Sequence, residues 1–89
     1  MSKSPPITIT SAALRAKVEQ GLGRPVADDV WKRSEAYARM KLDYCRERYP
    51  EIDYYDNFYL AVLAFDTVKE IEFSDYTAAD CAAKMAAGL

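Results

Sequence analysis

The sequence predicts a small all-α fold: one domain over residues 1–89, a four-helix bundle built on a long central antiparallel helix hairpin. Three observations lead to this fold class. The 89 residues are 51% hydrophobic and 29% charged, as expected of a single globular domain. Only three are glycine, and residues that favour helices are abundant. The longest apolar run, residues 58–65, has neighbours at helical spacing.

The chain begins with a segment, residues 1–10, that we expect to form an extended N-terminal arm. Pro5 and Pro6 favour a polyproline-like path. Residues 7–10 then alternate apolar and polar side chains, which is typical of extended backbone. A lone segment of this kind forms no sheet by itself, so the arm is expected to lie against the core or a partner.

A first short helix is predicted over residues 11–20. Thr10 or Ser11 is expected to cap its first turn, because a hydroxyl can accept from the unpaired N–H groups there. Gly21 is expected to end the helix as its left-handed residue.

The second helix, predicted over residues 28–48, is the first half of the hairpin. Asp28 and Asp29 suit the positive end of its dipole, and Arg46 and Arg48 suit the negative end. Five residues share one face and are the predicted core stripe: Trp31, Ala38, Leu42, Cys45 and Tyr49.

The third helix, predicted over residues 54–72, contains the apolar run and is expected to form the centre of the core. Its predicted inward stripe is Tyr54, Phe58, Ala61, Phe65, Val68 and Ile71. Truncating Phe58 or Phe65 to alanine is therefore expected to cost about 3–5 kcal/mol each. Leu60 and Leu63 fall outside this stripe, which leaves two alternatives: the short first and fourth helices cover them closely, or they are available to a second subunit in a homodimer.

A short fourth helix is predicted over residues 77–87. Thr77 and Asp80 have the spacing of a capping box, in which two residues satisfy each other's backbone N–H groups. Cys81 lies on the apolar face of this helix, and Gly88 is expected to stop it.

The residue types present restrict the chemistry. The chain has no histidine, which excludes histidine-based acid–base catalysis and histidine-ligated metals. No phosphate-binding glycine motif or calcium loop occurs, so we expect no catalytic residue, cofactor or metal. The two cysteines lack metal or disulfide spacing, and the first residues lack a signal peptide. A cytoplasmic, non-membrane, non-enzymatic protein is expected.

The leading functional prediction is a protein-interaction module that can self-associate, with a protein partner of unspecified identity. Tyrosine is common at interfaces because it combines a large apolar ring with a polar tip. The predicted interaction surface is formed by Tyr37, Tyr44, Tyr49, Tyr54, Tyr55 and Tyr59.

Charge asymmetry supplies two alternatives. Residues 1–50 carry ten basic and six acidic residues, whereas residues 51–89 carry two basic and eight acidic ones. The acidic half could occupy the basic groove of a nucleic-acid-handling protein, as phage or mobile-element inhibitors do. The acidic face predicted for this role is Asp66, Glu70, Glu72 and Asp75.

The second alternative is a helix-turn-helix-like DNA-binding protein. It rests on the basic residues of the second helix: Lys32, Arg33 and Arg39. The leading acids of that helix, Asp28 and Asp29, and a pI of about 5.0 oppose this interpretation, so nucleic acid is not the favoured partner.

Overall fold

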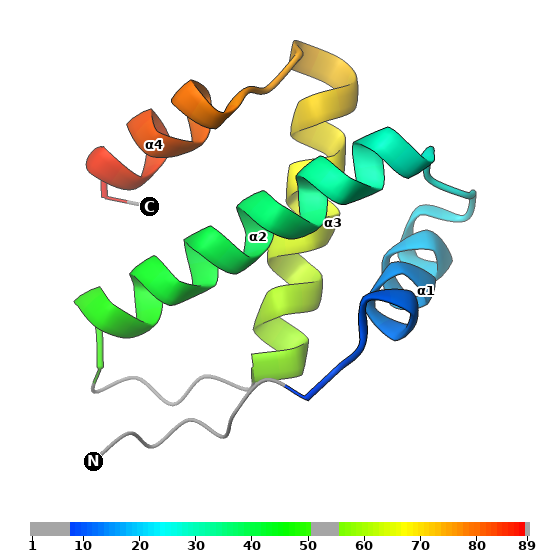
Figure 1. The fold of residues 1–89 in the computed structure, drawn as a ribbon, viewed down its shortest axis with the longest axis horizontal. Helices are drawn as coiled ribbons and strands as arrows, with labels where there is room; N and C mark the ends of the chain where they lie inside the picture. Colours follow the sequence, from blue (N-terminus) through cyan, green and yellow to red (C-terminus); the bar gives the residue numbers. More distant parts are fainter. Residues whose placement is uncertain (1–7, 51–55, 89) are drawn as a thin grey trace.

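The fold contains four α-helices in a computed structural model that describes residues 8–50 and 56–88 (Figure 1). They are α1 (Ser11–Leu22), α2 (Asp28–Arg48), α3 (Asp56–Ser74) and α4 (Ala78–Ala86). No strand occurs in the described ranges, so the predicted all-α class with four helices is confirmed for them. The radius of gyration is 12.8 Å, and the molecule is flat, with extents of 38 × 27 × 16 Å.

The helix starts follow local capping chemistry. The Thr10 hydroxyl accepts from the backbone N–H of Ala13 at 3.1 Å, which satisfies one of the unpaired donors of α1. The predicted capping box of α4 is present: Thr77 accepts from the Asp80 N–H, and the Asp80 carboxylate accepts from the Thr77 N–H at 2.9 Å. Short-range sequence therefore determines where these helices begin.

The end of α1 differs from the prediction. The left-handed residue is Gly23, with φ of 75°, and Gly21 lies inside the helix. Leu22 packs against the core, which extends the helix past Gly21. At Gly21 the lack of a side chain serves close packing instead, because a Cβ there would lie 3.3 Å from ring carbons of Phe65.

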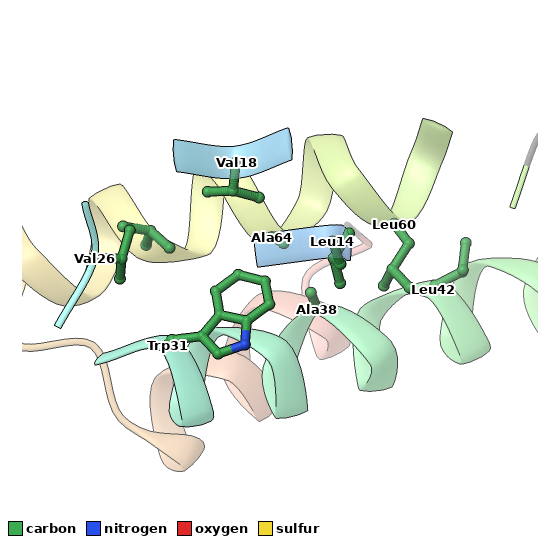
Figure 2. Packing of buried hydrophobic residues seen from close by; sticks show 9 residues of the cluster. Leu14, Val18, Val26, Trp31, Ala38, Leu42, Leu60 and Ala64 are labelled. Carbon is green, nitrogen blue, oxygen red and sulfur yellow. The ribbon is translucent and has the colours of Figure 1, made fainter. Parts of the chain in front are cut away.

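The main core lies where α2 crosses α3, with α1 packed on α3 (Figures 1 and 2). Leu14 and Val18 enter it from α1. The predicted stripe of α2 is confirmed for its first three residues, because Trp31, Ala38 and Leu42 are buried; Cys45 and Tyr49 are half-buried. From α3 the core receives Leu60, Ala64 and Val68.

A smaller cluster joins α4 to α2. Ile71, Tyr76 and Cys81 are buried together, and Tyr37 and Met85 pack against them. The Tyr37 and Tyr76 rings meet edge to face at 5.9 Å between centroids. α4 therefore rests on α2 through this cluster.

The inward face of α3 is rotated relative to the predicted stripe. Phe58 is 63% exposed, which contradicts its placement in the core, and Phe65 is half-buried. Leu60 is fully buried, so of the two alternatives it is covered within the chain and is not available to a second subunit; Leu63 is half-buried against the core. The cause is the crossing of α2, which covers the side of α3 that carries Leu60.

The predicted extended arm and the predicted tip of the hairpin fall mainly outside the described ranges. This holds for residues 1–7 and for residues 51–55, which include Tyr54 and Tyr55. Ile9, at the end of the arm, is half-buried against the core. Among the described helices, none has the length and apolar character needed to cross a membrane.

Candidate functional site

One side of α3 is exposed although most of its residues are apolar. We call this surface the outer face of α3 and define it by five residues spaced by three or four: Phe58, Val62, Asp66, Lys69 and Phe73. The exposed fractions are 81% for Phe73, 63% for Phe58 and 42% for Val62. With Met40, these are the exposed large hydrophobic residues of the described chain.

The outer face is exposed because the neighbouring helices occupy other sides of α3. At 100° per residue, the outer face lies opposite the buried residues Leu60, Ala64 and Ile71. Phe65, at the edge of the outer face, packs against Gly21 of α1. The remaining side of α3 has no helix on it in the described structure.

The middle of the outer face is charged, and its two ends are apolar. Asp66 and Lys69 are one turn apart and are both exposed. The Lys69 Nζ lies 5.2 Å from the centroid of the Phe65 ring, a cation–π distance. Within the described part of the chain, neither charge takes part in an ion pair. The face is electrically neutral as a unit.

The predicted tyrosine surface is divided among different environments. Tyr37 is half-buried in the cluster that holds α4. Tyr44 and Tyr49 line a shallow open hollow of about 580 Å³ at the end of α2. Tyr59 meets the outer face directly, because its ring contacts Phe58 edge to face at 5.8 Å. The last two members, Tyr54 and Tyr55, lie outside the described residues.

A buried lysine connects three helices. Lys41 of α2 is 1% exposed, and its Nζ donates to Thr67 Oγ1 at 3.0 Å and to Glu70 Oε1 at 2.8 Å. Lys84 of α4 donates to the other oxygen of Glu70 at 2.8 Å. Burial raises the pKa of Glu70, but hydrogen bonds and charge from the two lysines outweigh it and leave the pKa below its ordinary value. This site was not predicted from the sequence. Of its residues only Glu70 was named, as a member of the acidic face.

Tyr76 borders this network. The Lys41 Nζ lies 4.9 Å from the centroid of its ring. Its hydroxyl is buried and has no hydrogen-bond partner within the usual geometric limits among the described residues. Burial, with a smaller contribution from the adjacent Cys81 thiol, raises the pKa of Tyr76 strongly. A neutral phenol in this position supports packing, not acid–base chemistry at neutral pH.

Half of the predicted acidic face is already neutralised. Glu70 is bound by two lysines, and Glu72 pairs with Arg24, which lowers the pKa of Glu72. Asp66 and Asp75 are exposed, and Asp75 adopts a left-handed backbone with φ of 55°. The charge asymmetry of the sequence is thus partly compensated by contacts between the two halves.

The basic residues considered for DNA contact are also mostly engaged. Arg33 donates to the backbone carbonyl of Tyr76, and Arg39 pairs with Glu35 at 2.9 Å. Lys32 is exposed. The first turn of α2 carries Asp28, which pairs with Arg15 at 2.9 Å.

The described residues contain no group of three or more His, Cys, Asp or Glu side chains placed to hold a metal ion. Comparison of the chain with protein families, curated proteins and solved structures finds no match. On the surface of the chain itself, the outer face of α3 is the most unusual feature. Its signal in the sequence is the helical spacing of Phe58, Val62 and Phe73 on one line of the third helix.

Proposed function

We propose that this chain is a non-enzymatic protein-interaction module and that the outer face of α3 is its contact surface. The observation that carries the proposal is the exposure of Phe58, Val62 and Phe73 along one side of a central helix. A solvent-exposed aromatic ring forgoes the hydrophobic stabilisation that burial would provide. Phe58 and Val62 at one end of this side of α3, and Phe73 at the other, expose apolar surface of the kind that marks interaction sites on small proteins.

The tyrosine prediction contributes one member to this surface. Tyr59 lies beside Phe58 and extends the apolar area with a ring that also carries a hydroxyl. Tyr37 instead supports α4, so it is better regarded as a packing residue. The proposal retains an antiparallel hairpin of α2 and α3 as the scaffold that presents the face.

The alternatives receive less support from the contacts. An inhibitor that mimics a phosphate backbone needs carboxylates available to a basic groove, whereas Glu70 and Glu72 are already paired with cations. A DNA-binding role needs free basic side chains at the start of α2, whereas Arg33 is held by a backbone carbonyl. A non-enzymatic role is in keeping with the absence of histidine from the sequence.

Site-specific photo-crosslinking tests the proposal. A benzophenone amino acid would replace Val62 or Phe73, both exposed, and in a matched control Lys17, which is exposed on α1. After irradiation in native host cells, the account predicts discrete protein adducts from positions 62 and 73, whether to another protein or to a second copy, and none from position 17. Equal labelling at all three positions, or no adduct at 62 and 73, would contradict it.

A further inference from the structure

We propose that α4 and the loop before it form a lid that opens from α2 and α3 while the first three helices stay folded. We call residues 75–86 the lid. The inference goes beyond the proposed function, because the lid packs on residues other than those of the outer face of α3. Two observations carry it: the lid is attached by a small cluster separate from the main core, and a hydroxyl buried in that cluster lacks a hydrogen-bond partner.

The lid contributes little to the main core. Within the described residues, the main cluster consists of side chains from the first three helices and the segments beside them, and it includes no residue of α4. Cys81 is the buried residue of α4 and Met85 is half-buried, whereas the rest of this helix is exposed. Figure 1 shows α4 at the edge of the molecule. A core assembled without α4 can persist when α4 leaves it.

Few contacts hold the lid in place. Cys81 packs beside Tyr76 in the small cluster, and Arg33 of α2 donates to the Tyr76 carbonyl. Lys84 pairs with Glu70 of α3 at 2.8 Å, but the lysine side chain is largely exposed, and such ion pairs stabilise little. A helix of nine residues is too short to persist alone in water. Once released from these contacts, α4 therefore unwinds as well.

The closed position of the lid has a polar cost. Tyr76 is buried with its ring against Tyr37, and its hydroxyl has no hydrogen-bond partner among the described residues. A buried hydroxyl that has lost water without gaining another partner disfavours the closed state. The Tyr76 ring also lies over the buried Lys41 ammonium, at 4.9 Å from the ring centroid to Nζ. Opening returns the hydroxyl to water and removes the ring from the ammonium, so the lid is poised to open.

Thiol labelling of Cys81 measures the opening directly. The Cys81 side chain is fully buried, so iodoacetamide reaches it only when the lid is open. Mass spectrometry of tryptic peptides reads Cys81 separately from Cys45, because lysines and arginines divide the two positions. When the lid recloses faster than the reagent reacts, the labelling rate reports the open population.

Urea distinguishes opening of the lid from unfolding of the whole chain. Opening of the lid exposes little surface, so the Cys81 labelling rate should change little with urea well below the unfolding midpoint. Hydrogen exchange of the backbone amides of Leu42 and Leu60, two fully buried core residues, should instead accelerate steeply with urea.

Two variants and a matched control test the contacts of the lid. Tyr76→Phe keeps the ring and removes the unpaired hydroxyl, so it should slow Cys81 labelling roughly 5- to 100-fold. Lys84→Gln removes the ion pair with Glu70 and should speed labelling roughly 2- to 5-fold. Lys17→Gln makes the same change at an exposed position on α1 and should leave the labelling rate unchanged.

Three results would overturn the inference. Labelling of Cys81 with the same steep urea dependence as core amide exchange would make α4 part of a single cooperative unit. Labelling without urea as fast as that of the unfolded chain would show that no closed lid exists. A Tyr76→Phe variant that labels as fast as the wild type, or faster, would reject the polar cost of the closed position.

Discussion

Two truncations on the same helix should have very different effects on stability. Leu60 is fully buried between α2 and α1, whereas Phe73 is 81% exposed on the outer face of α3. Replacing either with alanine removes an apolar side chain from α3. Their costs differ because only Leu60→Ala leaves a cavity in the core.

The magnitudes follow from burial. A domain of this size is expected to have a free energy of unfolding of roughly 4–13 kcal/mol, at about 0.05–0.15 kcal/mol per residue. Leu60→Ala should cost about 2–5 kcal/mol, a large share of that total. A fully buried phenylalanine costs about 3–5 kcal/mol to truncate, and Phe73 is only about one-fifth buried. Phe73→Ala should therefore cost less than about 1 kcal/mol.

Urea unfolding monitored by circular dichroism measures this contrast, with m-values compared to check that the transition stays two-state. The chain should be kept near 1 µM, because a dimer would add a concentration-dependent contribution to stability. If Phe73→Ala destabilises the monomer as much as Leu60→Ala does, then the outer face belongs to the core and the assignment of α3 is wrong.

The buried lysine network yields two further predictions, which share one variant. In urea unfolding at pH 7, Lys41→Met should change the free energy of unfolding by less than about 1 kcal/mol, because Glu70 still pairs with Lys84 and reaches solvent. Glu70→Gln should lower it by about 3 kcal/mol, because Lys41 is then buried without a carboxylate partner. Equal costs for the two would contradict this asymmetry. The second prediction is acid sensitivity: since the folded pKa of Glu70 lies below its ordinary 4.5, its stabilisation is present above pH 4.5 and is lost as pH falls through the folded pKa. Unfolding midpoints measured from pH 7 to pH 3 should fall less steeply for Glu70→Gln than for the wild type, and parallel curves would refute the role of Glu70.

Helix positions were predictable because their signals are local. The limits of α2 match the expected residues 28–48, α4 differs from expectation by one residue at each end, and α3 ends two residues later than expected. The predicted start of α3, residues 54–55, lies outside the described residues. Thr77 and Asp80 form their capping box within four residues of chain. Such contacts depend on no distant part of the molecule, so short sequence patterns are sufficient to identify them.

The orientation of α3 was not predictable in the same way. Its apolar run covers most of the helix circumference, so periodicity alone does not tell which side is inward. The inward side of α3 is determined by α2 and α1, which cover Leu60 and Ala64 and leave Phe58 and Val62 exposed. The buried position of Lys41 is also a tertiary effect, because it depends on Thr67 and Glu70 from another helix.

The most direct test of the account is site-specific photo-crosslinking from the outer face of α3, with benzophenone at position 62 or 73 and, as the matched control, at position 17. Val62 and Phe73 are exposed on the outer face of α3, and Lys17 is exposed on α1. The account predicts discrete protein adducts from positions 62 and 73 and none from position 17. Equal adduct yields at all three positions, or no adduct at positions 62 and 73, would contradict the outer face of α3 as the contact surface.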